Sequence, residues 1–304
     1  MTGNKAVKIV VWGLDSTFDS IINLLRYESI QGNIHVIAIV CNNGFHNMSI
    51  DGIPIISSDE LKNTKFDYII STSQNNFETA NSMFPNHVIK SKVLLTPLFE
   101  LKNYIKLYRS DISIVSDDCW GAYVYNYLGL QFRSPFILAS IKPDDYLTLL
   151  TDLKGFLTSP IECWQDFPDC PTGYLEYNGK RVLINFTHCT DFSSARIDWI
   201  RRIERFNYNN YFIKMTLHSD TEAQMFSKLP YTHKIGFFYR ESLLDDVFYL
   251  TQWGQKESRV LPAVNNNFKS FVLRSFDSNY NGVIRPLNLI RLLLGEKDYQ
   301  RFSV

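Results

Sequence analysis

The chain has 304 residues, of which 45% are hydrophobic and 20% are charged, so its composition is that of a soluble globular protein long enough for two domains. Its 31 basic residues balance its 31 acidic residues, which argues against nucleic acid as a partner because binding to a phosphate backbone requires a basic excess. No stretch reaches the roughly 18 consecutive apolar residues that a membrane-spanning helix requires.

The five cysteines indicate a reducing compartment. Their number is odd, and the chain begins with a short polar stretch that leads directly into a strand. We therefore expect free thiols and a cytoplasmic protein. The cysteines are Cys41, Cys119, Cys163, Cys170 and Cys189.

The first third of the chain alternates apolar strands with helices. Its predicted elements include strands over residues 7–12, 35–40, 65–71 and 90–95 and a linking helix over residues 99–108. Such alternation implies a parallel sheet with right-handed crossovers. We predict a Rossmann-like domain over residues 1–110, followed by a second domain over residues 111–304.

Gly13 follows the first strand, at the position where a dinucleotide-binding loop begins. The fingerprint of such a loop has small residues where the pyrophosphate approaches, but Asp15 and Phe18 occupy its second and third glycine positions. After the second strand, Asn42 or Asn43 replaces the acid that binds ribose. Gly13, Ser16 and Asn42 are candidate nucleotide contacts; the simpler alternative makes Asp15 or Ser16 a helix cap.

The strand–Gly–helix unit, the later Asn42-Asn43 pair and the segment DGIPIISSDEL form one pattern over about residues 7–85. This pattern resembles the N-terminal Rossmann-like modules of bacterial sugar-modifying and polysaccharide-biosynthesis enzymes. The resemblance implies recognition of a nucleotide or a nucleotide sugar, and no other cofactor is expected.

The second half opens with a strand, a polar turn and a helix within residues 111–136. The strand ends in Ser116-Asp117-Asp118, and Gly129 closes the helix. Further strands predicted over residues 181–186, 211–217 and 234–239 also end in polar residues. We predict a larger three-layer α/β domain built on a parallel sheet.

If these strands are parallel, their polar ends lie along one edge of the sheet, where open α/β folds bind ligands. The residues at this edge would be Asp117, Asp118, His188, His218 and Asp220. Helix capping accounts for the aspartates. It does not account for the two histidines.

The predicted helix over residues 192–206 carries a basic face beside an apolar stripe. Arg201 and Arg205 lie one helical turn apart, and Asp198 can pair with Arg202 at a spacing of four residues. Guanidinium groups bind phosphate and carboxylate bidentately. A network of internal ion pairs is an equally good interpretation.

Several short motifs follow one another over about residues 111–240. They are Cys119-Trp120-Gly121, Ser134-Pro135-Phe136, Pro143-Asp144-Asp145-Tyr146, His188 and the series Trp199, Arg201, Arg202, Arg205 and Asn207. Together they resemble a bacterial family of uncharacterised exopolysaccharide or capsular-polysaccharide biosynthesis proteins. The resemblance implies a role in surface-glycan assembly, although Asp117 and Asp118 replace an Asn-Asn pair of the family pattern.

The leading hypothesis is a transferase that acts on a sugar nucleotide or a glycan. Its general base would be His188, Asp117 or Asp118, since all three side chains can take up a proton. Cations would neutralise a diphosphate leaving group. The predicted substrate-binding residues are Trp120, Arg133, Arg201, Arg205, Lys214 and His218.

No metal site is expected. The chain has no Asp-x-Asp pair, and the spacing of Cys163 and Cys170 does not match a zinc site. Two alternatives to a glycan transferase remain: a binding or scaffolding protein of the same pathway, and a thiol acyltransferase that uses Cys119 with His188.

Overall fold

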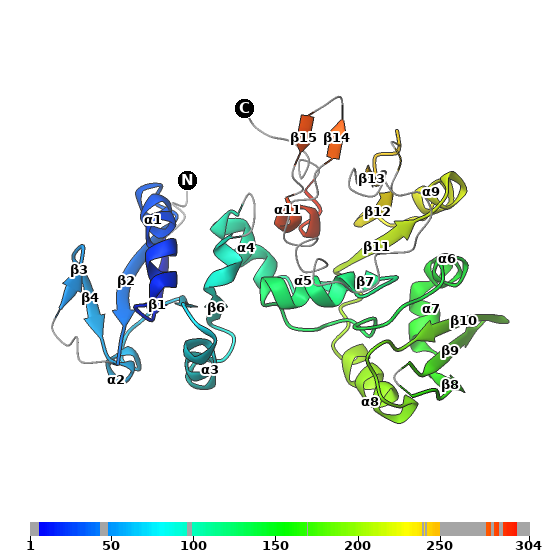
Figure 1. Ribbon diagram of the computed structural model, residues 1–304, viewed down its shortest axis with the longest axis horizontal. Coiled ribbons are helices and arrows are strands. Elements are labelled where there is room, and N and C mark those ends of the chain that lie inside the picture. Colours follow the sequence, from blue (N-terminus) through cyan, green and yellow to red (C-terminus); the bar gives the residue numbers. More distant parts are fainter. Residues whose placement is uncertain are drawn as a thin grey trace. The chain divides into compact units, whose positions relative to one another are not determined.

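The computed structural model describes residues 6–42, 48–95, 99–168, 170–238, 240, 242–249, 278–280, 283–285 and 288–296. The chain divides into two compact units, Met1–Tyr104 and Ile105–Val304. The division falls within helix α4 (Leu101–Tyr108), a few residues before the boundary predicted near Ser110. Both units pack helices against a sheet that is wholly or mostly parallel, which confirms the α/β fold class (Figure 1), and unit 2 also has antiparallel sheets.

Unit 1 is built on a six-stranded sheet with the strand order β3-β4-β2-β1-β5-β6. All neighbouring pairs are parallel except β3 with β4. The strands are β1 (Val7–Trp12), β2 (Ile34–Val40), β3 (Ser49–Ile50), β4 (Ile53–Ile56), β5 (Tyr68–Ser71) and β6 (Val88–Lys90). β1 is nearly continuous in apolar residues, as expected for a parallel strand covered on both faces, and its Ile9, Val10 and Val11 are fully buried.

The helices of unit 1 begin at polar caps. Asp15 caps the first helix, Ser57 forms a capping box with Glu60 at the second, and Ser73 caps the third. They are α1 (Ser16–Ile30), α2 (Ser58–Leu61) and α3 (Gln74–Met83).

The predicted strand over residues 90–95 is wrong in its bounds. The strand is β6, and the 3-10 helix η1 (Ser91–Leu95) follows it. Val93 and Leu94 are buried in that helix. A short apolar run does not distinguish a strand from a buried helical turn, so the pattern was consistent with both.

Unit 2 contains a parallel four-stranded sheet with the order β13-β12-β11-β7. Its strands are β7 (Ser113–Ser116), β11 (Tyr211–Leu217), β12 (Lys234–Phe238) and β13 (Val247–Tyr249). Its helices are α5 (Trp120–Leu128), α6 (Pro143–Thr151), α7 (Leu153–Thr158), α8 (Phe192–Ile203), α9 (Asp220–Ser227) and α11 (Leu289–Leu293). A two-stranded antiparallel pair, β14 (Ser278–Tyr280) and β15 (Val283–Arg285), is also present.

Helices cover both faces of this parallel sheet. On one face, Trp120 of α5 packs against Phe212 of β11 and Phe237 of β12. On the other face, Ile213 and Met215 belong to the core that α6, α7, α8 and α9 complete. Within the part of the chain that the structure describes, no helix is long and apolar enough to cross a bilayer.

The strand predicted over residues 181–186 is present as β10 (Lys180–Asn185), but it does not belong to the parallel sheet as predicted. A separate antiparallel sheet has the order β10-β9-β8, from β8 (Glu162–Gln165), β9 (Thr172–Tyr177) and β10. Asn178 and Gly179 join β9 to β10, and both have positive φ, 48° and 71°. An Asn-Gly pair in this conformation forms a tight hairpin turn, so β10 runs antiparallel to its neighbour.

Candidate functional site

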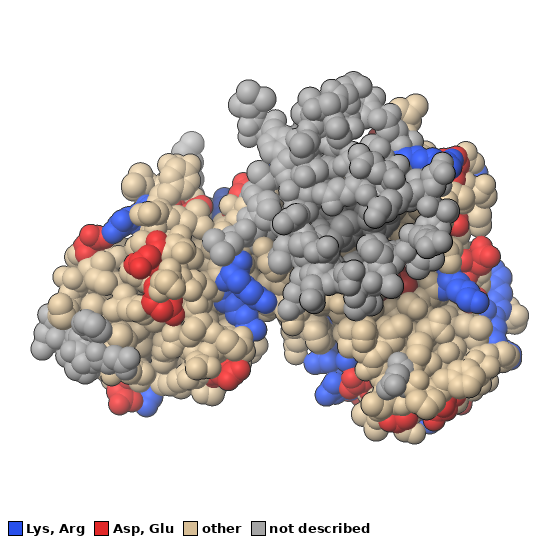
Figure 2. Space-filling model, viewed as in Figure 1, with Lys and Arg blue, Asp and Glu red and all other residues tan. Residues whose placement is uncertain are grey.

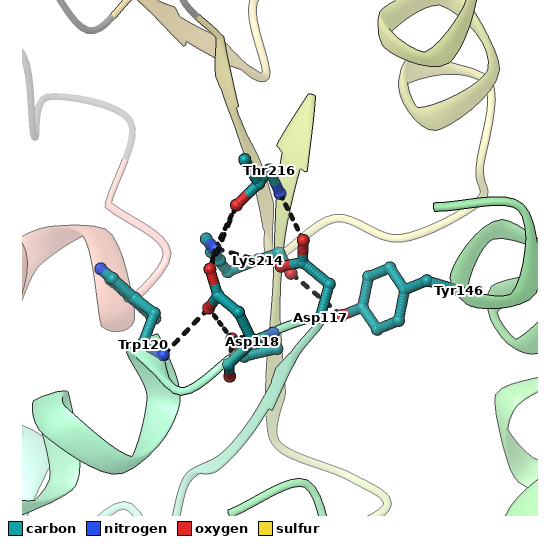
Figure 3. Close-up of polar contacts among 7 residues, drawn as sticks. Asp117, Asp118, Trp120, Tyr146, Lys214 and Thr216 are labelled. Carbon is teal, nitrogen blue, oxygen red and sulfur yellow. Dashed lines mark hydrogen bonds and ion pairs between the residues drawn. The ribbon is translucent and has the colours of Figure 1, made fainter. Parts of the chain in front are cut away.

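The candidate site lies at the carboxyl ends of β7 and β11, where three charged side chains meet (Figure 3). Lys214 Nζ donates to Asp117 Oδ1 at 3.0 Å and to Asp118 Oδ2 at 2.6 Å. β7 and β11 are adjacent parallel strands, so the side chains that follow one strand reach those of the other. We call Asp117, Asp118 and Lys214 the acid–lysine cluster.

Backbone and hydroxyl groups complete the hydrogen bonds of the acid–lysine cluster. The Thr216 amide donates to Asp117 Oδ2 at 2.9 Å, and the third donor position of Lys214 is used on the Thr216 hydroxyl at 2.6 Å. Asp118 Oδ1 accepts from the Trp120 amide at 2.9 Å, which fixes the start of α5. Ser116 Oγ donates to the same carboxylate oxygen at 3.0 Å.

The acid–lysine cluster is buried and carries one uncompensated negative charge when both carboxyls are ionised. Lys214 is 1% exposed and Asp117 is 8% exposed. Burial raises the pKa of Asp117 from 3.8 to about 6. The ammonium of Lys214 lowers this pKa, but the negative charge of Asp118 raises it and partly offsets that attraction. For Asp118 burial acts in the same direction, but the ammonium of Lys214 and the amide of Trp120 leave its pKa lowered.

Lys214 remains a cation in this environment. Burial by itself disfavours the charged ammonium, but the two carboxylates more than compensate and raise the pKa of Lys214. Of the two carboxyls, Asp117 therefore takes up a proton first as the pH falls, while Asp118 stays ionised beside Lys214.

A loop and helix α6 pack against the acid–lysine cluster. The Ile141 amide donates to the Asp117 carbonyl at 2.9 Å, and the Tyr146 hydroxyl donates to the Lys214 carbonyl at 3.0 Å. Burial raises the pKa of Tyr146, and the negative charge of Asp117 and Asp118 adds to the effect. Tyr146 is thus held as a neutral phenol.

Thr187 links the loop that contains Leu138 to Cys119, the residue before α5. Its hydroxyl donates to the Leu138 carbonyl at 2.8 Å and lies 3.4 Å from Cys119 Sγ. Leu138 (φ 59°) and His188 (φ 75°) both adopt the left-handed conformation, which is uncommon for residues with a Cβ and especially for Leu. Such positions concentrate near functional sites. We therefore include Leu138, Thr187 and His188 in the candidate site and call them its rim.

Only some of the candidate catalytic residues predicted from the sequence lie close together. Asp117 and Asp118 lie in the acid–lysine cluster, and Cys119 borders it. Burial raises the pKa of Cys119, which leaves an unactivated thiol. His188 is exposed on the rim. It follows the antiparallel strand β10, so the expectation that it ends a strand of the parallel sheet is wrong.

The predicted substrate-binding residues are dispersed. Lys214 belongs to the acid–lysine cluster, and Trp120 is buried with its amide bound to Asp118. His218 is exposed at the carboxyl end of β11, where its amide donates to Glu222. Asp220 begins α9 at the same edge.

The arginines lie at the other end of α8 from His188. α8 has 12 residues, about 18 Å at 1.5 Å per residue. Just beyond its end, the Asn207 amide donates to Ser113 Oγ at 2.8 Å, at the start of β7. The structure therefore separates Arg205 from the acid–lysine cluster at the opposite end of β7.

The basic face of α8 is an ion-pair network. Asp198 bonds Arg201 at 2.6 Å and Arg202 at 2.7 Å, which confirms the predicted pairing of Asp198 with Arg202. Arg202 is buried, whereas Arg201 is exposed. Arg133 pairs with Asp111 at 2.5 Å.

The glycine loop of unit 1 is filled by its own side chains. Gly13 has a φ of 117°, and a Cβ there would collide with the Thr72 hydroxyl and the Asn76 amide group. Asp15 caps α1 through the Thr17 amide and also accepts a hydrogen bond from Thr72 at 2.8 Å. The interpretation of Asp15 as a helix cap is confirmed.

The remaining candidate nucleotide contacts have local roles as well. Asn42 Oδ1 accepts from the Ser58 amide at 3.2 Å, and the Ser16 carbonyl accepts from Ser20 Oγ at 3.0 Å. Nucleotide binding by Gly13, Ser16 and Asn42 stays a prediction.

Sequence reasoning missed the partnership of Lys214 with the aspartates. It had placed Lys214 among phosphate-binding residues, although a lysine inside the apolar strand YFIKMTL is itself a signal, because lysine is rarely buried without a partner. Thr216 belongs to no distinctive motif, and Tyr146 is part of the motif Pro143-Asp144-Asp145-Tyr146 but was given no role at the site. Among the residues that the structure describes, no three His, Cys, Asp or Glu side chains gather as a metal site.

Comparison with known proteins places the acid–lysine cluster within a defined family. Residues 90–278 match the family described as Domain of unknown function (DUF1919). The chain belongs to the DUF1919 family. Residues 5–93 match a second family, C2185-like, N-terminal. The DUF1919 segment includes all residues of the acid–lysine cluster.

An uncharacterized protein of Haemophilus influenzae is also similar to the chain. The two are 26% identical over 196 residues, which cover 58% of this chain and 93% of that protein.

Proposed function

We propose that unit 2 is a glycan-acting transferase in which Asp117 is the general acid and base. The observation that supports this proposal is the buried Asp117 carboxyl, which lies between the Lys214 ammonium and the Thr216 amide. A catalytic acid or base works best when its pKa lies near the working pH, and the pKa of Asp117 is raised to about 6. Pairs of carboxyls with separated pKa values are the usual basis of such chemistry.

Each oxygen of Asp117 accepts one hydrogen bond, one from Lys214 and one from Thr216. A carboxylate oxygen has two lone pairs, so each oxygen retains one for a substrate. Asp118, by contrast, accepts two hydrogen bonds at each oxygen. Its role in the proposal is to set the pKa of Asp117 and to fix α5.

A glycan fits the acid–lysine cluster better than a sugar nucleotide does. A diphosphate leaving group needs unpaired cations, but all three donors of Lys214 are used within the site. Arg201 and Arg133 pair with aspartates elsewhere. A neutral polyhydroxylated substrate meets no electrostatic penalty beside the net negative charge.

In the proposed reaction, protonated Asp117 gives its proton to the glycosidic oxygen of the donor as the bond from that oxygen to the anomeric carbon breaks. The electron pair of the bond leaves on the oxygen. An acceptor hydroxyl then bonds the anomeric carbon and returns its proton to Asp117. The carboxyl finishes in the state in which it started.

A role in surface-polysaccharide assembly in the cytoplasm is part of the proposal. It is supported by the resemblance of the motifs and by the five free thiols. Burial of Cys119 raises its pKa and weakens the thiol acyltransferase alternative, because the thiolate is the nucleophile.

The test uses the full chain with fluorescently labelled oligosaccharides of neutral hexoses, with UDP-sugars as a second class of donor. Mass spectrometry would detect products that differ by whole sugar units. Asp117→Asn is expected to lower turnover roughly 100- to 10,000-fold, whereas Asp144→Asn, which removes an exposed carboxylate of α6, leaves turnover unchanged. Full activity of a folded Asp117→Asn variant would overturn the proposal, and binding without turnover would favour the scaffolding alternative.

A further inference from the structure

The antiparallel sheet of unit 2 has one buried face and one exposed face. On the buried face, Leu175, Val182 and Ile184 are fully buried. Tyr174 and Glu176, two residues apart on β9, point to the opposite face, and Arg181 of β10 pairs directly with Glu176. Figure 1 shows the three strands beside α6 and α7.

Aromatic rings form a platform on the exposed face. Trp164 of β8 is 46% exposed, and its ring meets that of Tyr174 edge-on, with centroids 6.1 Å apart. The pairing of β8 with β9 shifts register between Cys163 and Gln165, and a bulge of this kind redirects side chains. We call Trp164, Tyr174, Glu176 and Arg181 the aromatic platform.

Charged groups hold the rings of the aromatic platform in place. Arg181 Cζ lies 4.6 Å from the centroid of Tyr174 and 5.4 Å from that of Trp164. Its Nε and Nη2 donate to Glu176 Oε2 at 3.1 Å and 2.7 Å. Both partners are about half exposed, 46% for Arg181 and 51% for Glu176, so they also offer donors and acceptors to a ligand.

The chemistry of the platform selects against charged polymers. The one guanidinium is matched by one carboxylate, and Glu162 is exposed on β8 nearby, whereas a nucleic acid requires a basic excess. On the face drawn in Figure 2, basic and acidic side chains of the described residues are likewise interspersed. A neutral sugar ring instead offers an apolar face to an aromatic ring and hydroxyls to the paired charges.

The platform lies in line with the acid–lysine cluster. On the same face of the sheet as Tyr174, the next pair is Thr172, which is buried, and Asn185, whose side chains are hydrogen-bonded 2.9 Å apart. Thr187 comes next and contacts Cys119 at the rim. Leu183 stands opposite Tyr174, and β10 ends at Asn185, so Thr187 lies at most about 14 Å from Leu183 along the chain.

We propose that the aromatic platform is a distal subsite for a neutral glycan chain whose reacting end lies at the acid–lysine cluster. Trp164 stacks on a sugar ring, and Arg181 and Glu176 position Trp164 and bind hydroxyls. The inference rests on the proposed function for the direction of the chain. Binding at the platform itself can be measured without turnover.

The experiment compares the binding of maltoheptaose and cellohexaose with that of maltose and cellobiose to the full chain, by calorimetry. Trp164→Ala is expected to weaken binding of the longer sugars at least tenfold and that of the disaccharides less than twofold. Trp164→Phe, which keeps a ring, should restore most of the affinity. Tyr27→Ala removes another exposed aromatic side chain, 60% exposed, from unit 1 and should change nothing.

Several outcomes would overturn the inference: no binding of any longer sugar, equal loss for short and long sugars, or full affinity in Trp164→Ala. A change of oligomeric state in Trp164→Ala without loss of glycan binding would instead assign the platform to a second copy of the chain. Failure of the proposed function looks different. In that case Asp117→Asn keeps its turnover while Trp164→Ala still loses the longer sugars.

Discussion

Replacing Asp117 with Asn removes a titrating group and keeps its shape. The pKa of Asp117 is raised from 3.8 to about 6, so the folded protein binds this proton more tightly than the unfolded chain does. The resulting stability is fully present below pH 3.8 and is lost as the pH rises through 6. The total is about 3 kcal/mol, at about 1.4 kcal/mol for each pKa unit.

About 2 kcal/mol of this loss falls between pH 4.5 and pH 7.5. The free energy of unfolding of the unmodified protein should therefore fall by that amount relative to Asp117→Asn over this range. For a unit of this size the difference corresponds to a relative shift of roughly 4–8 °C in melting temperature. The amide group of Asn costs one hydrogen bond to Thr216 or Lys214, but that cost does not vary with pH.

Hydrogen exchange of the β11 amides in the full chain would report the opening of unit 2 alone, at several pH values. Asp144→Asn serves as the control, because an exposed carboxylate should leave the difference independent of pH. If the difference for Asp117→Asn also stays flat within about 0.5 kcal/mol, Asp117 ionises normally and the reasoning about its raised pKa is refuted.

Three further predictions concern other parts of the molecule. Gly13→Ala should destabilise unit 1 by about 2 kcal/mol or more, measured by chemical denaturation, because φ is positive and the added methyl collides with neighbouring side chains; a neutral result would contradict the description of this loop. Arg202→Met should cost about 1–3 kcal/mol, since it removes a buried guanidinium that bonds Asp198 and the Ile137 carbonyl, whereas Arg201→Ala should cost less than about 0.5 kcal/mol; equal effects in thermal unfolding would argue against this difference. Iodoacetamide should modify exposed Cys163 well before Cys119, as followed by mass spectrometry of peptides, and the reverse order would show an activated Cys119.

Much of the parallel framework could be predicted because its strands are short apolar runs with polar ends. Asp117 and Asp118 were found in this way, since a polar pair at the end of a buried strand marks the ligand-binding edge of an α/β sheet. Lys214 was noticed as a charge but not as their partner. The pairing depends on which strands are neighbours, and local patterns do not encode that order.

The placement of His188 failed for a related reason. Its strand reads as a buried parallel strand, and only the turn Asn178-Gly179 reveals that the strand returns along its neighbour. The prediction that Arg201 and Arg205 lie at the sheet edge failed for another reason. A helix N-terminus near the sheet edge does not bring its last turn to the same edge, because each residue advances about 1.5 Å along the axis.

The two halves of the acid–lysine cluster are 97 residues apart in sequence, which has a consequence for folding kinetics. Closing a loop of that length costs about 4 kcal/mol plus a constant in chain entropy, so β7 and β11 gain little by pairing until the intervening helices and hairpin have formed. Until then, Asp117 and Asp118 have no ammonium beside them. A lower pH should therefore ease the docking of β11 as far as it protonates Asp117, whereas Asp118, whose pKa is lowered, gains from the Lys214 ammonium only while it is ionised. The high sequence separation keeps unit 2 a slow folder.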